Sequence, residues 1–335
     1  MATEIDDKPL KTWSYLSTGA RRRPSEYEVV STGLHYHTRD PDQPFELSPD
    51  IPMAEWYKRY RNQSPLRHPD WDAFRDPDEM IYRNYNLVQD GQENYVWGLF
   101  DQFNARGHDQ MLAPEWPAFL ARAYTPARYV MHALQMGSAY VHQMAPGSTI
   151  TNCAAYASGD HLRWVTHTAY RTRELANACP GLGFGELERE HWETLPAWQG
   201  YRELLERALV AWDWGEAFVA FFLVAKPAVE EALLGVLGDA ARQHQDMLLG
   251  LLTQAQMRDA ERHRRWVTAL VRMALAEEGN RAVLDGWCAR WLPLGEAAIN
   301  AWCAALPEDG PAAAARARAA MRAFVASTGL SAGTT

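Results

Sequence analysis

The chain has 335 residues, of which 47% are hydrophobic and 22% are charged, and its formal net charge is −9. This balance indicates a globular protein with ample core for one large or two medium domains, and the negative charge argues against a nucleic-acid-binding surface. No run approaches the roughly 18 apolar residues of a membrane span, and the acidic stretch Met1 to Lys11 lacks an apolar signal region. We therefore expect a cytoplasmic protein.

Residues 1–80 are rich in proline and aromatic side chains and form the first predicted domain. Nine of the nineteen prolines lie here, which excludes long helices and favours extended chain. The aromatic content is too high for a disordered tail. We expect an extended arm that lies partly on its own bundle and partly across a neighbouring subunit. The triplet Arg21-Arg22-Arg23 is interpreted as the solvated start of this arm rather than as a basic patch.

Helical spacing of apolar residues begins near Asp78. Together with Pro and Gly breaks, it predicts helices over 78–104, 127–144, 151–177, 200–237, 247–276 and 280–306, and a loop with a short helix over 183–195. Pro227 is expected to kink or divide the fourth helix, and Pro293 to bend the sixth. No segment has a strand pattern. We predict an all-α, ferritin-like helical bundle over 81–308, followed by an Ala/Arg-rich extension over 309–335 that is partly mobile.

The cysteines and the large aromatic residues indicate the environment of the chain. Cys153, Cys179, Cys288 and Cys303 include no Cys-x-x-Cys pair, so we expect free, buried thiols in a reducing compartment. Fourteen Trp and fourteen Tyr are many for this length. Large aromatic side chains fill deep cores and partner interfaces, which favours an obligate assembly.

One polar pattern occurs twice on the predicted helices. Asp160-His161-Leu162-Arg163-Trp164 and Asp259-Ala260-Glu261-Arg262-His263 both contain Asp-x-x-Arg followed by a large ring, and they lie 99 positions apart. Residues i and i+3 share a helix face, so each Asp can pair with its own Arg. Both helices are apolar, and unpaired buried charge is costly. We favour one paired arrangement in the core over two separate surface salt bridges.

Both segments resemble the ligand helices of a di-iron oxygenase bundle. There, two helices each supply a Glu and two others each supply a Glu-x-x-His. Compared with the Asp-Glu-x-Arg-His form of those helices, His161 and Trp164 replace the first Glu and His, and Ala260 replaces the second Glu. Only His263 remains.

The other two ligand positions are also altered. In the di-iron pattern each lone Glu falls roughly thirty residues before its Glu-x-x-His partner. Counting back reaches Met131 and Lys226-Pro227; neither has a Glu in register, and Glu230 and Glu231 lie beyond the proline. We therefore predict no catalytic, no cofactor-binding and no metal-ligating residue in this chain.

Other polar residues are given structural interpretations. Glu188 to His191 is a true Glu-x-x-His match, but a di-iron site needs two such matches and two further Glu, so we interpret it as surface charge. Asp213 and Glu216 lie in an apolar helix, and we expect them to pair with basic groups. Three scattered histidines are also predicted to be structural: His35, His37 and His108. No phosphate-binding glycine loop, dinucleotide fingerprint or Gly-x-Ser-x-Gly motif is present.

Short segments spread over about residues 8–308 carry a family resemblance. They are Arg23-Pro24-Ser25-Glu26-Tyr27-Glu28, Leu34-His35-Tyr36, Pro52-Met53, Trp56-Tyr57, Asp76-Pro77-Asp78, Tyr82-Arg83, Gln92-Glu93-Asn94-Tyr95-Val96, Leu162-Arg163-Trp164, Thr166-His167-Thr168-Ala169-Tyr170-Arg171-Thr172 and Asp259-Ala260-Glu261-Arg262-His263. Together they resemble the β subunits of bacterial multicomponent monooxygenases, specifically the toluene/o-xylene and toluene monooxygenase hydroxylases. The Ala/Arg-rich C-terminus lies outside the resemblance.

The resemblance implies a structural subunit that is paralogous to a catalytic α subunit and lacks the di-iron centre. It implies an α2β2γ2 hydroxylase, in which this chain contacts α, a small γ subunit and a second β subunit, with its arm around α. Electrons from NADH would arrive through a reductase and a ferredoxin, and a small effector protein would also bind. The implied chemistry, in the α subunit, is O2-dependent hydroxylation of aromatic hydrocarbons such as toluene, o-xylene or benzene.

Two other functions stay open. The chain could be a catalytic di-iron oxygenase with an atypical ligand set, drawn from Asp259, His263, Glu188 and His191. It could instead be a docking module for electron-transfer partners, because an acidic surface can steer a partner toward it.

Overall fold

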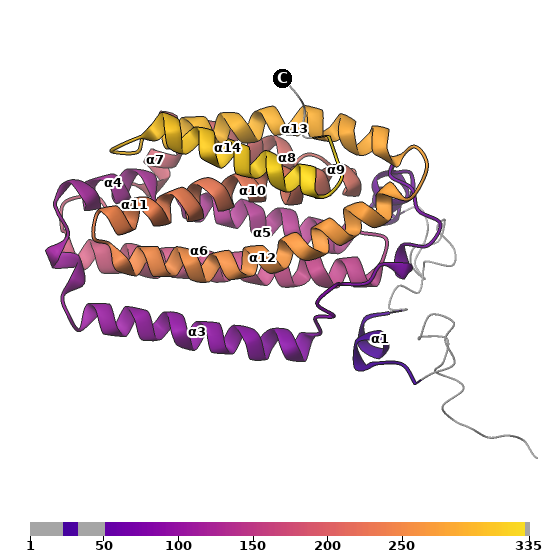
Figure 1. Ribbon diagram of the computed structural model, residues 1–335, viewed down its shortest axis with the longest axis horizontal. Helices are drawn as coiled ribbons and strands as arrows, with labels where there is room; N and C mark the ends of the chain where they lie inside the picture. The colour runs from indigo at the N-terminus through magenta and orange to yellow at the C-terminus, as the bar shows by residue number, and fades with distance from the viewer. Residues whose placement is uncertain (1–22, 33–50, 332–335) are drawn as a thin grey trace, which may run out of the picture.

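The computed structural model describes residues 23–32 and 51–331. Within these ranges the chain is helical and has no β-strand, which confirms the all-α prediction (Figure 1). Among the described helices, none combines the length and the apolar character that crossing a membrane requires. The α-helices are α1 (Glu26–Ser31), α2 (Pro52–Tyr57), α3 (Tyr82–Asn104), α4 (Glu115–Ala123), α5 (Ala127–Met144), α6 (Ser148–Ala178), α7 (Glu188–Thr194), α8 (Pro196–Ala208), α9 (Trp214–Phe218), α10 (Lys226–Val229), α11 (Leu237–Gln243), α12 (Met247–Leu275), α13 (Asn280–Cys303) and α14 (Gly310–Ser327).

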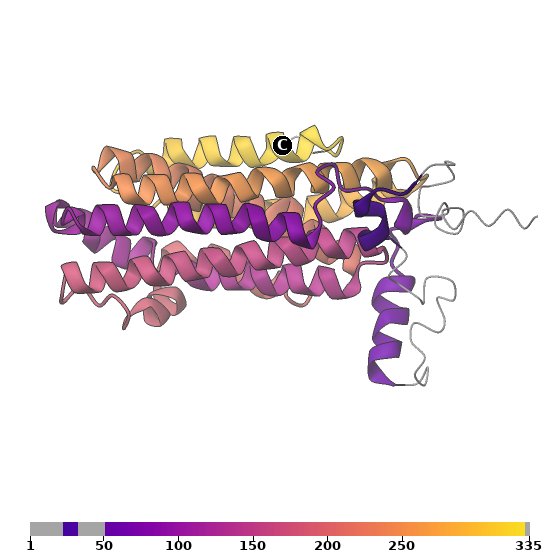
Figure 2. The same ribbon diagram turned by 90° about the horizontal axis from the view of Figure 1, so that it is seen from below.

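The long helices lie lengthwise beside one another in a layered bundle (Figure 1). α5 packs on α6, α11 on α12, and α8 on α13. Figure 2 shows α3 lying over the line where α6 and α12 meet, with its outer face turned away from the rest of the bundle. α6 and α12 carry the two Asp-x-x-Arg segments, so this arrangement brings the repeated pattern together beneath α3.

The helix predicted over 200–237 is divided at a different place. α8 ends at Ala208, and the Asp213 carboxylate caps α9 by accepting hydrogen bonds from the backbone N–H groups of Gly215 (2.9 Å) and Glu216 (3.1 Å). From Trp214 the chain stays helical to Gln243, through α10 and the π-helical segments η6 (Val219–Ala225) and η7 (Glu230–Val236). The chain is not divided at Pro227, which lies in α10 between the two π-helical segments.

The Ala/Arg-rich segment near the C-terminus forms α14, which packs on α13 and η7. One face of α14 is buried, including Ala313, Ala317, Met321 and Val325 at four-residue spacing. Beyond the helix Leu330 is also buried. The last four residues, which end the predicted mobile tail, lie outside the described part of the chain.

The described parts of the N-terminal arm form short helices on the bundle. A capping box opens α1: the Ser25 hydroxyl accepts the Glu28 N–H, and the Ser25 N–H donates to the Glu28 carboxylate at 2.7 Å. Tyr27 is buried, and its hydroxyl accepts the backbone N–H of Asp76 at 3.0 Å. The Ser148 hydroxyl at the start of α6 donates to the Ser31 carbonyl oxygen at 2.7 Å, so this part of the arm lies on the bundle. Several aromatic and apolar residues of the predicted arm lie outside the described residues: Trp13, Leu34, Tyr36, Phe45 and Leu47.

Gly200 brings α8 against the backbone of α13. A Cβ at this position would lie 2.7 Å from the Ala298 Cα and 2.9 Å from the Ala297 carbonyl oxygen. We expect Gly200→Ala to lower the free energy of unfolding by about 1–3 kcal/mol, measured by urea denaturation, because the two backbones must separate.

Gly286→Ala on α13 is the matched control. A Cβ there meets nothing within 4 Å. It should stabilise the fold by about 0.5–1 kcal/mol, because alanine favours the helix over glycine. Equal effects of the two substitutions would show that α8 and α13 are not in tight contact.

Candidate functional site

The two Asp-x-x-Arg segments form one buried network between α6 and α12. Asp160 is 0% and Asp259 1% exposed. Arg163 Nη1 lies 3.3 Å from Asp160 Oδ1 and 3.1 Å from Asp259 Oδ2. Arg262 Nη2 contacts Asp160 Oδ2 and lies 3.7 Å from Asp259 Oδ1. We call these four residues the central ionic cluster; they confirm the predicted paired arrangement in the core.

Neutral donors from α3 and α6 complete the central ionic cluster. The Tyr85 hydroxyl donates to Asp160 Oδ1 at 3.0 Å. Gln89 Nε2 lies 2.7 Å from that same oxygen and 3.0 Å from Asp259 Oδ1. The Trp164 indole N–H donates to Asp259 Oδ2 at 3.1 Å. Through Gln89, α3 therefore bonds to both halves of the repeated pattern.

Opposite charges offset the free-energy cost of burying the central ionic cluster. Burial raises the pKa of Asp160 and of Asp259, and the neighbouring arginines oppose that rise. Burial alone would lower the pKa of Arg262, but Asp160 and Asp259 raise it above its ordinary value. Two carboxylates and two guanidinium groups offset one another, whereas a lone buried charge is penalised by several kcal/mol.

The positions aligned with iron ligands carry groups that do not fit a di-iron centre. The His161 ring lies 5.1 Å from the Trp164 ring and 5.6 Å from the His263 ring, between centroids. Lys226 Nζ lies 5.9 Å from the Trp164 ring centroid, and Ala260 is fully buried. A bridged di-iron site needs four carboxylates and two imidazoles, and these positions supply no carboxylate. Over residues 23–32 and 51–331, no group of three or more Asp, Glu, His or Cys could hold a metal ion.

Lys226 is held by an ion-pair chain of its own. The side chain is 2% exposed, and its Nζ contacts Glu230 Oε1 one helical turn later. Arg264 Nε donates to Glu230 Oε2 at 2.6 Å. The Glu230 carboxylate therefore sits between two cations and fixes the position of the ammonium group.

A second buried ionic group farther along α6 was not predicted from the sequence. Arg171 is 0% exposed, contacts Asp109 and lies 3.4 Å from Asp246. Asp246 also accepts the Trp116 indole N–H at 3.0 Å. Burial acts to raise the pKa of Asp246, but Arg171 and the hydrogen bonds lower it to about 2. Arg171 follows Asp160 by eleven residues, close to three helical turns, and this spacing was the available signal of a shared buried face.

Glu188 and His191 lie apart from the central ionic cluster. Glu188 is 1% exposed and accepts the backbone N–H of Gly185 at 2.6 Å, so its interpretation as surface charge was wrong. The His191 Nδ1–H donates to the Ala121 carbonyl oxygen at 2.9 Å. Their helix, α7, packs on α4 and α8 rather than on α12. The structure therefore does not assemble the atypical ligand set, which comprised Asp259, His263, Glu188 and His191.

The remaining acids and histidines have structural roles. Glu216 pairs with Arg290 at 2.6 Å, as predicted. Asp213 was expected to pair with a basic group as well, but it caps α9 and accepts the Ser64 hydroxyl at 2.9 Å. His108 Nε2 lies 3.2 Å from Asp246 Oδ1, at the edge of the second buried ionic group. His35 and His37 lie outside the described residues.

The cysteines form no site. All four are free, with Cys153, Cys288 and Cys303 buried and Cys179 half-buried. Burial raises the pKa of Cys288 to about 12. Because the thiolate is the reactive form, this environment makes the thiol inert.

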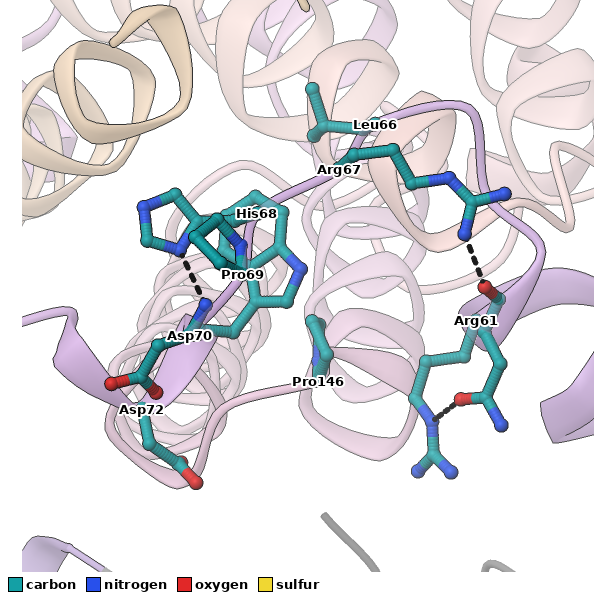
Figure 3. A pocket seen from close by; sticks show the side chains of 10 residues that line it. Arg61, Leu66, Arg67, His68, Pro69, Asp70, Asp72 and Pro146 are labelled. Carbon is teal, nitrogen blue, oxygen red and sulfur yellow. Dashed lines mark hydrogen bonds between the residues drawn. The ribbon is translucent and has the colours of Figure 1, made fainter. Parts of the chain in front are cut away.

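A surface pocket of about 250 Å³ is lined mainly by residues 61–72 of the arm, together with Pro146 (Figure 3). The backbone N–H of Asp70 donates to His68 Nδ1 at 3.0 Å. Arg67 Nη1 donates to the Asn62 carbonyl oxygen at 2.8 Å. Its polar groups bond one another, and we assign the pocket no chemistry.

Asp160→Asn should destabilise the fold strongly. The substitution keeps the side-chain shape but removes one of the two carboxylates beside Arg262, and breaking a buried ion pair costs about 3–5 kcal/mol. Urea denaturation measures the change. Asp78→Asn is the control: the Asp78–Arg265 pair is largely exposed (24% and 51%), so its loss should cost at most about 1 kcal/mol. A similarly small loss for Asp160→Asn would contradict the role assigned to the cluster.

The stability contributed by two buried histidines, His161 and His263, should fall as the pH is lowered from about 6.5 to 5, whereas Glu174, whose pKa burial raises to about 7, contributes in the opposite direction. Burial is the largest effect that holds the pKa values of His161 and His263 well below 6.5, and nearby cationic groups add to it. In this window the unfolded chain binds protons that the folded chain does not. The stability contribution is therefore fully present above the unfolded pKa and declines below it, by about 1.4 kcal/mol per pH unit for each histidine.

Unfolding measured across this pH range checks the sign and the slope. His161→Gln should reduce the slope of the free energy of unfolding against pH by the contribution of one histidine, about 1.4 kcal/mol per pH unit. His132→Gln, at an exposed position of α5, is the control and should leave it unchanged. Equal slopes for His161→Gln and the unsubstituted chain would contradict the assignment.

Comparisons with known proteins place the chain in a family. Residues 56–278 match the family model described as Methane/Phenol/Alkene Hydroxylase. The chain is 55% identical over 302 residues to the hydroxylase component subunit beta of the toluene-4-monooxygenase system from Ectopseudomonas mendocina, over 90% of this chain and 92% of the relative.

Solved structures add evidence on the fold. A chain from toluene 4-monooxygenase with toluene bound in the resting active site matches with a TM-score of 0.86 at 55% identity, covering 90% of this chain and 99% of that one. A chain of the xenon-pressurized phenol hydroxylase from Pseudomonas sp. OX1 matches with a TM-score of 0.82 over 92% of each chain; at 19% identity this likeness concerns the fold alone.

The family match spans both Asp-x-x-Arg segments and the helices from α3 to α12. The resemblance inferred from the short sequence segments is thereby confirmed. The chain belongs to the methane/phenol/alkene hydroxylase family.

Proposed function

We propose that this chain is the structural β subunit of the hydroxylase component (α2β2γ2) of a di-iron aromatic-hydrocarbon monooxygenase, of the toluene, o-xylene or benzene type. The proposal rests on one observation: the helical bundle is complete, but Trp164, Lys226 and Ala260 occupy positions that align with the iron ligands of a di-iron oxygenase. The 55% identical relative is itself named as a hydroxylase β subunit. In this role the chain holds the dimer together and supports the catalytic α subunit during O2- and NADH-dependent ring hydroxylation.

The proposed partners follow from this role. The di-iron centre belongs to the α subunit, and this chain carries no cofactor of its own. A γ subunit and a second β subunit complete the hydroxylase, and a ferredoxin, an effector protein and a reductase bind it transiently in the cytoplasm. The arm over residues 1–80 reaches the α subunit, while residues 81–308 and the extension over 309–335 form the supporting bundle.

The outer face of α3 supports a partner-bound role. Leu87 and Val88 are 68% and 44% exposed. Gly91 and Gly98 lie on the same side of the helix, at four and eleven residues from Leu87, and a Cβ at either would meet nothing within 4 Å. An apolar strip beside such small residues lets another helix approach closely. Exposed apolar patches of this kind mark protein interfaces, and we assign this face to a neighbouring subunit.

Iron content of the full-length chain, expressed alone and with its α partner, tests the proposal. We expect no stoichiometric iron in the isolated chain and iron in the co-purified complex. Leu87→Glu should reduce the recovered α subunit and iron at least tenfold, because it places a charge in an apolar contact.

Met111→Glu is the matched control. Met111 is 71% exposed, lies in the η5 turn (His108–Met111) rather than on α3, and its substitution should leave recovery unchanged. About two irons on the isolated chain, as a bridged site holds, would overturn the structural role. Full recovery with Leu87→Glu would reject only the assignment of the α3 face.

A further inference from the structure

The second buried ionic group places three carboxyl groups around one guanidinium group. Arg171 Nη1 contacts the Asp109 carboxylate and lies 3.7 Å from Glu174 Oε2, and Arg171 Nη2 lies 3.4 Å from Asp246 Oδ2. The three acids are 6%, 8% and 0% exposed, in that order. One guanidinium charge cannot balance three buried carboxylates, and buried charge without a counter-charge is costly.

Two oxygens of this group have no donor. Asp109 Oδ1 and Glu174 Oε2 are buried and accept no hydrogen bond from the parts of the chain that the structure describes. The other oxygen of each carboxyl group is served, Asp109 Oδ2 by Arg171 and Glu174 Oε1 by the side-chain amide of Asn104 at the end of α3. A buried acceptor without a donor is penalised, and a proton on either carboxyl group provides a donor and removes one negative charge.

The contacts indicate which carboxyl group carries this proton. Asp246 accepts an indole N–H and a backbone N–H, both at 3.0 Å, in addition to its contact with Arg171. Asp109 makes the closest contact with the guanidinium group, and Glu174 lies farthest from it. Burial raises the pKa of Glu174 to about 7, against the opposing effects of Arg171 and the Asn104 amide, and Asp109 adds to the rise.

The two carboxyl groups that lack a donor belong to elements of very different length. Asp109 lies in η5, a four-residue turn that follows Gly107 with a left-handed φ of 62°. Glu174 lies on α6, which has 31 residues. Figure 1 shows that α3 leads into α4 at one end of the bundle, and η5 is part of this connection. Repulsion between two ionised carboxylates would therefore displace the short turn rather than the long helix.

We propose that Glu174 and Asp109 hold one proton between them, and that release of this proton loosens residues 104–112 from α6. This end of the bundle would then respond to pH through residues of this chain alone, whichever partner the chain binds. Other ionisable groups also face the pair, from α6, η5 and the segments before α12 and after α4 and α6: Arg171, Tyr170, His108, Asp246, Tyr124 and Cys179.

Hydrogen–deuterium exchange of the full-length chain, followed on peptides that cover residues 104–112, tests the proposal. The protection factor corrects each rate for the pH dependence of chemical exchange. In the unsubstituted chain it should fall about tenfold between about pH 6 and pH 8, because a carboxyl group whose pKa is raised by folding stabilises less as the pH rises through that pKa. Glu174→Gln keeps the shape of the protonated acid and should keep high protection at both pH values.

Infrared difference spectra between the two pH values give a direct readout. The carbonyl band of a protonated carboxyl group should be lost at the higher pH in the unsubstituted chain, and this change should be absent from Glu174→Gln. Glu190→Gln, at an exposed position of α7, is the control and should behave as the unsubstituted chain in both measurements.

His108→Gln separates the proposal from titration of the neighbouring imidazole, since a histidine can change its charge in the same pH range. It leaves Glu174 in place and should retain the tenfold change, so it also serves if Glu174→Gln does not fold. If Glu174→Gln loses protection as the unsubstituted chain does, or if His108→Gln abolishes the change, Glu174 does not control the turn. Constant protection in the unsubstituted chain would equally overturn the proposal.

Discussion

The bundle depends on two buried carboxylates that each lie beside two guanidinium groups. Asp160 and Asp259 come from different helices, and each lies closer to the arginine of the other helix than to the arginine of its own. The desolvation penalty of each charge is offset only when the helices are docked in one register. Gln89 then ties α3 to the same oxygens. In this chain, fixed side-chain charges join helices at the place where a metalloenzyme of similar fold would use coordinated ions.

Because the positions aligned with iron ligands carry no carboxylate, no metal charge has to be balanced there, but the volume of the site must still be filled. Trp164 supplies volume, and its indole N–H also serves the Asp259 carboxylate. Lys226 supplies a positive charge, and Glu230 neutralises it locally. The substitutions therefore form a connected set in which steric filling and charge compensation are achieved by neighbouring residues.

Sequence patterns predicted the features that neighbouring residues determine, such as where a helix begins and ends. Pro126 and Pro146 bracket α5, and its predicted range of 127–144 was correct. Burial of the Asp-x-x-Arg pairs followed from their apolar helices, but the crossed pairing of Arg163 with Asp259 depends on how two distant helices dock. Glu188 was misassigned because its acidic neighbours indicate a surface, whereas its burial depends on tertiary packing. The continuous helix through Pro227 depends on π turns, for which the sequence carries no simple spacing signal.

The sequence separation within the cluster affects how the chain folds as it is synthesised. Arg163 and Asp259 are 96 positions apart, and Asp160 and His263 are 103 apart. α6 therefore emerges from the ribosome well before the α12 side chains that make the closer ion pairs with it. Until then its polar groups favour water over the core, so the early helices remain loosely docked. Contacts this distant form late and leave apolar surface exposed in the meantime. Nascent chains that end before α12 are consequently natural clients for chaperones.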